Sequence, residues 1–263
     1  MAKKEVAKRD ETAVADFNFE GMGTGLENVT AADIIIPRIT ILQGLSPQLV
    51  KTKPEYDKDA KVGDIYDVGL QENFGESIVF LPVHFMKQWL EWAPRNSGKG
   101  LCGIHNTPTI LDECEANEKG KPVLPSGNYI AETAQFFGFN LSANGRRSFL
   151  PMASTQLKKA RRLLTLATNM KLTNSAGHEY TPPLFYRTYV LGTVGESNAE
   201  GDWIGWTVDV GAPIDKTDLW EGDGQKIMTD IKEFRQQLTS GSIAGDVATM
   251  EMEAASSSND GAM

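Results

Sequence analysis

The chain has 263 residues, 40% of them hydrophobic, and a formal net charge of −9. That size and apolar content suffice to bury a core, and 25 glycines with 12 prolines favour many turns, so we expect a β-rich globule. The N-terminal residues contain no apolar run of signal-peptide length, there are only two cysteines, and no stretch approaches the roughly 20 apolar residues that a membrane helix needs. We therefore expect a cytoplasmic protein rather than a membrane or disulfide-rich secreted one.

Changes in composition divide the chain into three parts. Residues 1–30 mix charges and glycines without an apolar period, which predicts a flexible N-terminal arm. Residues 31–238 contain the periodic apolar segments and predict a single β-rich domain. Residues 239–263 contain acids but no Lys or Arg, which predicts a disordered acidic tail.

Two regions predict antiparallel strands most clearly. The run from Glu76 to Trp92 is rich in β-forming residues with little helical spacing, which is typical of a central strand. Residues 128–140 and 147–152 predict two more strands, joined by a turn over residues 142–145. Asn-Gly between apolar runs is a strong hairpin signal, so Arg146 and Arg147 should leave this turn together.

One segment, from Ser154 to Leu172, predicts an amphipathic helix with Ser154 or Thr155 as its N-cap. Its apolar residues recur every three or four positions, at Leu157, Ala160, Leu163 or Leu164, Ala167 and Met170. Its cations fall away from this stripe and form a predicted basic face: Lys158, Lys159, Arg161 and Arg162.

The C-terminal part predicts a second hairpin and a second helix. Residues 184–190 alternate in a way that would place Arg187 on one face with Phe185 and Tyr189, and residues 203–211 predict the partner strand. Residues 225–238 have apolar residues at helical spacing. The expected fold is therefore mainly β, of the α+β class, with one embedded basic helix and a C-terminal helix.

The net charge of −9 hides a strong asymmetry along the chain. Between Thr133 and Val190 there are eight cations and one acid, Glu179, a local net charge of +7, so the rest of the chain carries −16. Gathering such charge without a counter-charge is costly, and the segment predicts a site for an anionic ligand. The plainer interpretation is a helix whose basic residues are simply solvated.

Single-stranded nucleic acid is held by cations that follow its phosphates and by aromatic faces on which its bases stack. This segment and its surroundings offer both kinds of side chain. The candidate phosphate contacts are Arg146, Arg147, Lys158, Lys159, Arg161, Arg162, Lys171 and Arg187, and the candidate stacking residues are Phe137, Tyr186, Tyr189, Trp89 and Trp92. Each single aromatic is more often a core residue than a stacking platform. Duplex DNA is less favoured because the sequence has no helix-turn-helix, zinc finger or basic zipper.

Motifs for catalysis and cofactor binding are missing from the sequence. It has no phosphate loop ending in Gly-Lys-Ser/Thr, and its histidines have no nucleophile elbow or metalloprotease helix beside them. Cys102, His105 and Cys114 are three candidate zinc ligands, but their spacing matches no standard finger, and free thiols with a surface histidine are the more common outcome. We expect no catalysis, cofactor or metal.

Four stretches follow one another along the chain: IIIPRITILQGLSPQLV, VGDIYDV, SIVFLPVHFMKQWLEW and FLPMASTQLKKARRLLTL. In this order, between Asp33 and Val190, the sequence resembles a family of tailed-phage early proteins associated with single-stranded DNA binding in replication and recombination. The resemblance implies an OB-like or related antiparallel β-barrel and cooperative coating of exposed strands in the host cytoplasm. The resemblance also implies that the cations of the predicted helix, residues 158, 159, 161 and 162, contact DNA.

The resemblance also implies that the acidic tail contacts replication or recombination proteins. Single-strand binding proteins whose tails recruit partners often end in an acidic run followed by an aromatic or apolar anchor. In this chain Ser256 to Ser258 interrupt the acidic run, and Asp260 is followed by Gly-Ala-Met. Partner recruitment is therefore a weaker expectation than DNA binding.

Three functions remain open at this point. The leading prediction is a non-catalytic protein that coats single-stranded DNA without sequence preference, as a homo-oligomer or cooperative assembly. The alternative is a phage structural or scaffold protein whose basic helix meets an acidic protein surface without binding DNA. The third is an enzyme acting on nucleic acid, such as a metal-dependent nuclease.

Overall fold

The computed structural model describes residues 25–30, 33–94, 97–199, 201–243 and 245. The chain divides into two compact units, residues 1–34 and residues 35–263, and the elements below belong to the second. Most of the predicted arm and most of the predicted acidic tail lie outside the described residues.

Antiparallel strands make up most of the ordered elements in the second unit. The strands are β1 (Ile39–Ile41), β2 (Ile65–Asp67), β3 (Glu72–Asn73), β4 (Ser77–Trp92), β5 (Leu101–His105), β6 (Glu115–Ala116), β7 (Pro122–Val123), β8 (Tyr129–Asn140), β9 (Arg146–Ala153), β10 (Leu172–Thr173), β11 (Glu179–Tyr180), β12 (Arg187–Asn198) and β13 (Gly201–Pro213). The helices are α1 (Leu157–Thr168) and α2 (Asp218–Thr239), with short 3-10 turns between several elements. The predicted mainly β architecture with an internal basic helix and a C-terminal helix is confirmed.

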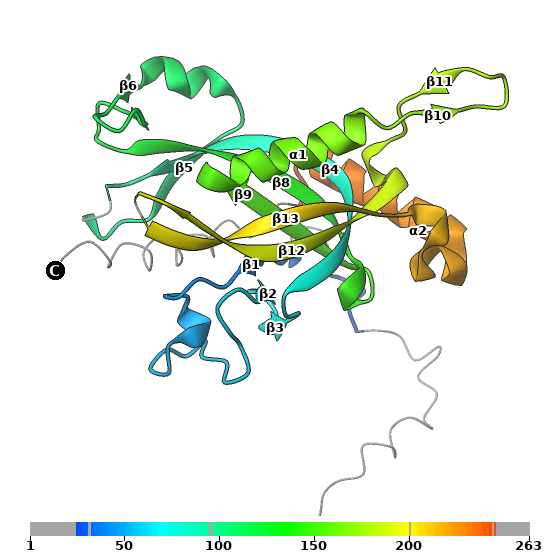
Figure 1. Cartoon of the computed structure of the whole chain (residues 1–263), viewed down its shortest axis with the longest axis horizontal. Coiled ribbons are helices and arrows are strands. Elements are labelled where there is room, and N and C mark those ends of the chain that lie inside the picture. The colour runs from blue at the N-terminus through cyan, green and yellow to red at the C-terminus, as the bar shows by residue number, and fades with distance from the viewer. Residues whose placement is uncertain (1–24, 31–32, 95–96, 200, 244, 246–263) are drawn as a thin grey trace, which may run out of the picture. The chain divides into compact units, whose positions relative to one another are not determined.

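The main sheet has the strand order β13-β12-β4-β8-β7-β6, with β5 paired to β4 and β9 paired to β8. Its long strand β4 curves strongly, so the sheet curls around one face (Figure 1). The register between β4 and β8 shifts between Pro82 and His84, and such bulges bend a strand. Opposite this bulge, a Cβ on Gly138 would lie 2.2 Å from the carbonyl oxygen of Leu81, so only glycine fits there.

The concave face of the curled sheet holds the main core, which β1, α1 and the strands β4, β8, β9, β12 and β13 all line. Phe80, Phe136 and Leu191 are fully buried there. Helix α1 adds Ala160 and Leu163, two members of the predicted apolar stripe. The helix is therefore held to the body by its apolar face, which leaves Lys158, Arg161 and Arg162 on its exposed side.

The observed helix α1 is shorter than the predicted segment from Ser154 to Leu172. Residues 154–156 form a 3-10 turn in which Ser154 has φ 51°, and no side chain caps the helix start. The helix ends at Thr168, whose hydroxyl donates to the carbonyl of Leu164, and the chain then enters the small β10–β11 hairpin. The predicted N-cap is thus wrong, because the chain reaches the helix through a tight turn from β9.

Helix α2 packs on the other face of the sheet, where Phe139 and Phe234 meet with ring centroids 5.6 Å apart. Its buried residues are Ile227, Ile231, Phe234 and Leu238, which the helical spacing of residues 225–238 predicts. The helix is interrupted at Asp223, which has φ −164° and whose carboxylate accepts from the backbone amides of Gln225 and Lys226. Asp223 therefore acts as an N-cap for the predicted segment.

Both predicted hairpins are present with small differences at their ends. Strands β8 and β9 pair from Thr133↔Ala153 to Asn140↔Arg146, and the turn uses left-handed conformations at Asn144 and Gly145. Strands β12 and β13 pair throughout, but residues 184–186 form a 3-10 turn, so the alternation predicted from Phe185 onward begins only at Arg187. Among the described residues, no helix is both long and apolar enough to cross a membrane.

Candidate nucleic-acid interface

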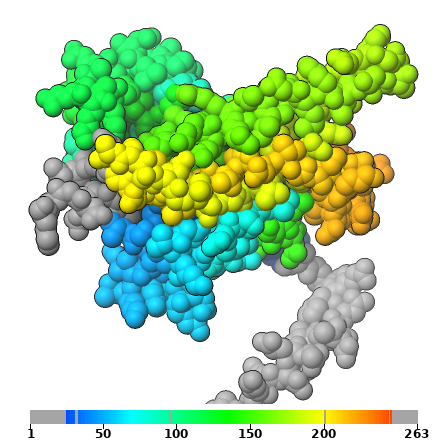
Figure 2. Space-filling model, viewed as in Figure 1, coloured from blue at the N-terminus to red at the C-terminus, as the bar shows by residue number. Residues whose placement is uncertain are grey.

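Helix α1 lies along β13, the outermost strand at one end of the main sheet. Two side chains form hydrogen bonds with backbone groups at the outer edge of β13. Gln156 Oε1 accepts from Trp206 N–H at 2.9 Å, and Arg162 Nε donates to Val208 O at 3.0 Å. Unpaired groups at a sheet edge otherwise attract other strands. The contacts fix the helix beside the β12–β13 ribbon, and Figure 2 shows the two as neighbouring surfaces, in green and yellow.

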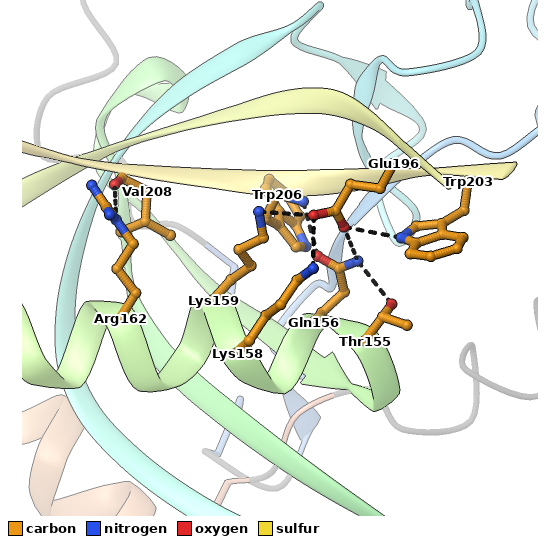
Figure 3. Close-up of polar contacts among 9 residues, drawn as sticks. All are labelled: Thr155, Gln156, Lys158, Lys159, Arg162, Glu196, Trp203, Trp206 and Val208. Atoms are coloured by element: carbon orange, nitrogen blue, oxygen red, sulfur yellow. Dashed lines mark hydrogen bonds and ion pairs between the residues drawn. The ribbon is translucent and has the colours of Figure 1, made fainter. Parts of the chain in front are cut away.

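The first turn of α1 meets the ribbon at one carboxylate, that of Glu196 on β12. Lys158 Nζ and Lys159 Nζ lie 3.1 and 3.0 Å from Glu196 Oε1. Trp203 Nε1 donates to Oε2 at 3.0 Å, and Gln156 Nε2 lies 3.4 Å from the same oxygen. Figure 3 shows the lysines reaching from the helix to this carboxylate, with the Trp203 ring on its other side.

The surroundings of Glu196 strongly favour its charged form. Burial disfavours ionisation, but hydrogen bonds from Lys159, Lys158 and Trp203 and the charge of Lys159 outweigh it and lower the pKa of Glu196 to about 2. The carboxylate therefore stays charged throughout the physiological pH range.

Replacing Glu196 by glutamine tests this electrostatic coupling. We expect Glu196→Gln to lower the free energy of unfolding by about 1 kcal/mol at pH 7, a modest effect because water screens the well-exposed Lys158. The folded-state pKa is depressed, so the stabilisation is present above the ordinary pKa of 4.5 and is lost as the pH falls toward 2. Urea unfolding followed by circular dichroism should show the two proteins converging over that range; a difference independent of pH would contradict the assignment.

A surface hollow of about 460 Å³ opens beside Glu196. It is lined by Thr155, Lys158, Glu196, Ser197, Asn198 and Trp203. Trp203 is half-buried and belongs to the hairpin rather than to the main core. The hollow thus brings an aromatic ring next to a cation at the surface.

Further cations lie on the exposed side of α1. Arg161 is exposed, and the side chains of Lys158 and Arg162 are 60% and 58% exposed. Arg162 also lies 3.8 Å from the exposed Asp209, and Lys171, beyond the helix, donates to Thr181 Oγ1 at 2.7 Å. Residues 158, 161 and 162 are spaced as neighbours on one helix face. We call Lys158, Arg161 and Arg162 the helix cations.

The arginines of the β8–β9 turn do not belong to this surface. Arg146 forms ion pairs with Glu72 and with the buried Asp67, and the hydrogen bond to Glu72 raises the pKa of Arg146. Arg147 lies over the Phe234 ring, 4.8 Å from its centroid, and donates to Gln237. Both predicted phosphate contacts therefore have partners in the fold, and Arg187 is half-buried at the start of β12.

Most of the predicted stacking residues are buried in this structure. Phe137 stacks on Phe149 with ring centroids 5.6 Å apart, and Tyr189 is part of the main core. Trp89 and Trp92 are only 8% and 7% exposed. These four rings therefore offer no free face for stacking in this structure, which agrees with the plainer expectation that each single aromatic is a core residue.

The one remaining predicted aromatic, Tyr186, is half-buried in the 3-10 turn before β12. Trp203 and Glu196, by contrast, were not among the predicted site residues. The hairpin register places them directly opposite each other. Pairing the two predicted strands residue by residue could have indicated that their side chains meet on one face.

The zinc candidates lie apart from the helix cations. Cys102 is exposed on β5, and Cys114 Sγ contacts the carbonyl of Ile110. His105 Nε2 lies 3.1 Å from Glu91 Oε2. Across the part of the chain that the structure describes, no three His, Cys, Asp or Glu side chains are grouped to hold a metal ion.

A family model described as Pam3 phage gp34-like protein matches residues 4–243, which is most of the chain. The chain belongs to this phage protein family. The phage part of the resemblance seen in the sequence is thereby confirmed, while single-stranded DNA binding stays a prediction. No curated protein and no solved structure matches the chain.

Proposed function

We propose that this phage protein is a non-catalytic binding protein for single-stranded DNA, and that the strand runs along the exposed side of α1 beside the β12–β13 ribbon. The observation that carries the proposal is the combination of the helix cations with the hollow that contains Trp203. Cations can follow the phosphates there, and the indole offers a stacking surface.

The geometry suits binding without sequence preference. The helix cations are exposed on long flexible side chains, and the hollow beside them opens at the surface rather than forming a closed pocket. Stacking and phosphate contacts are available to every nucleotide. Cooperative assembly on DNA and recruitment of replication or recombination proteins through residues 239–263 remain part of the proposal.

Titration of the protein with oligo-dT at low salt tests the proposal. We expect quenching of tryptophan fluorescence, since Trp203 lies within the proposed interface, and a Trp203→Phe variant should lose most of that quenching while it still binds. Fluorescence anisotropy of a labelled oligonucleotide measures binding independently. Absence of binding at low salt by both methods would contradict the proposed function.

A protein-interaction role without DNA binding is the second candidate, and one observation favours it. Lys158, Lys159 and Arg162 contact acids of their own chain, so the surface is less basic than the local sequence implies. This candidate predicts stable oligomers whose size is indifferent to added oligo-dT. Size-exclusion chromatography with light scattering, with and without oligo-dT, separates the two functions.

A further inference from the structure

Four hydrogen-bond donors surround the carboxylate of Glu196. Two are ammonium groups, 3.1 and 3.0 Å from one oxygen, and two are the Trp203 indole and the Gln156 amide, which face the other oxygen. The Glu196 side chain is only 14% exposed. Donors of this kind, gathered around one anionic group, are the arrangement that also binds phosphate.

The ribbon has room for this anion because of a glycine. A Cβ on Gly205 would lie 2.2 Å from Glu196 Oε2 and 2.8 Å from its Cδ, so any side chain at this position would collide with the carboxylate. Gly205 pairs with Val194 in the hairpin, two residues along β13 and β12 from the Trp203 and Glu196 positions and therefore on the same face. The anion position is thus built by two strands and the first turn of α1.

We propose that Glu196 occupies the place of a nucleic-acid phosphate between Lys158 and Lys159, and that a phosphate of the bound strand displaces it. This inference rests on the proposed function. Both groups are anions with several acceptor oxygens, so a phosphate can use the same lysines, while the displaced carboxylate can turn into the adjoining hollow.

A competing carboxylate has two consequences for the protein. Without ligand it keeps the two lysines paired, which stabilises the fold and lowers the basicity of the surface. On binding it must be displaced, which weakens affinity. Because its pKa is about 2, protonation does not remove it at physiological pH, so the ligand itself must do so.

The test compares oligo-dT affinity in variants of the full chain at low salt. We expect Glu196→Gln to bind about tenfold more tightly even though its fold is less stable, because the phosphate then no longer has to displace a carboxylate from the two lysines. Gly205→Ala, which pushes the carboxylate out, should also bind more tightly. Asp202→Asn, exposed on the same hairpin, removes the same charge without touching the lysines and should change affinity less than twofold.

Several results would overturn the inference while leaving the proposed function intact. One such result is that the wild type binds oligo-dT and the Glu196→Gln variant binds it no more tightly. Another is an equal gain in affinity for Glu196→Gln and Asp202→Asn, because equal gains would show only a general effect of net charge. A gain for inorganic phosphate without one for oligo-dT would assign the position to a small anion. No binding by wild type or any variant would instead remove the proposed function itself.

Discussion

Charge reversal of two helix cations, Lys158→Glu with Arg161→Glu, is expected to lower the affinity for oligo-dT at low salt by about 100-fold, or about 2.7 kcal/mol. Each change replaces an attraction to phosphate with a repulsion at a surface where water screens it only in part. Both side chains are exposed and on the outer side of α1, so the fold should survive the change. Anisotropy titration measures the loss, and circular dichroism verifies the fold.

A control with the same change in net charge separates local contact from overall charge. Lys53→Glu with Lys232→Glu places the substitutions on exposed residues of a loop and of α2. When both double variants are titrated at 0.1 M salt, where screened charges act over about 10 Å, we expect this control to lose less than about fivefold in affinity. Equal losses in the two double variants would show that no strand lies on α1.

Removal of the Phe234 ring is expected to have the largest effect on stability. Phe234 is fully buried, packs on Phe139 and carries Arg147 over its face. Phe234→Ala should therefore lower the free energy of unfolding by about 3–5 kcal/mol, the usual cost of deleting a buried aromatic side chain. Urea unfolding at a fixed temperature measures this loss.

Phe185 provides a matched control for this substitution. It is only half-buried and has Arg235 over its ring at 5.7 Å, so Phe185→Ala should cost about 1 kcal/mol. The Phe234 variant also tests the role of Arg147. If Arg147 supports α2 rather than DNA, the folded fraction of Phe234→Ala should keep the affinity of wild type within about threefold, and a loss comparable to that of the Lys158 and Arg161 variant would place Arg147 in the interface.

Local patterns along the chain were sufficient to predict most of the secondary structure. The Asn144–Gly145 turn, the apolar spacing of α1 and the buried positions of α2 depend on neighbours within a few residues. The start of α1 could not be predicted from local patterns. The 3-10 turn at residues 154–156 connects the end of β9 to the helix, and its conformation depends on where these two elements lie in the folded protein. An OB-like barrel remains an expectation beyond the observed curled sheet.

The charge pattern was the more misleading signal. The segment from Thr133 to Val190 carries net +7, but its partners come from elsewhere in the chain: Glu72 and Asp67 reach Arg146, and Glu196 meets two lysines. These pairs join residues up to 79 positions apart in sequence, from Asp67 to Arg146. A sum of charges along the chain cannot show them, because folding rather than sequence distance determines which charges meet.

The aromatic residues show the same limit. Phe137 and Trp203 look equally suited to stacking in the sequence, yet Phe137 lies between the sheet and its covering layer and Trp203 lies at the edge of a surface hollow. The two rings differ in the strand face on which they lie and in what covers that face. Strand register and the packing of α2 determine whether each ring is buried, and neither can be predicted from residue type.

The salt dependence of wild-type binding to oligo-dT tests the central claim most directly. With the three helix cations on phosphates, the logarithm of the association constant should fall against the logarithm of salt concentration with a slope of about −2. Loss of Lys158 and Arg161 should reduce the slope toward −1. A slope near zero, or one that these substitutions leave unchanged, would contradict the claim that a nucleic-acid strand binds along α1.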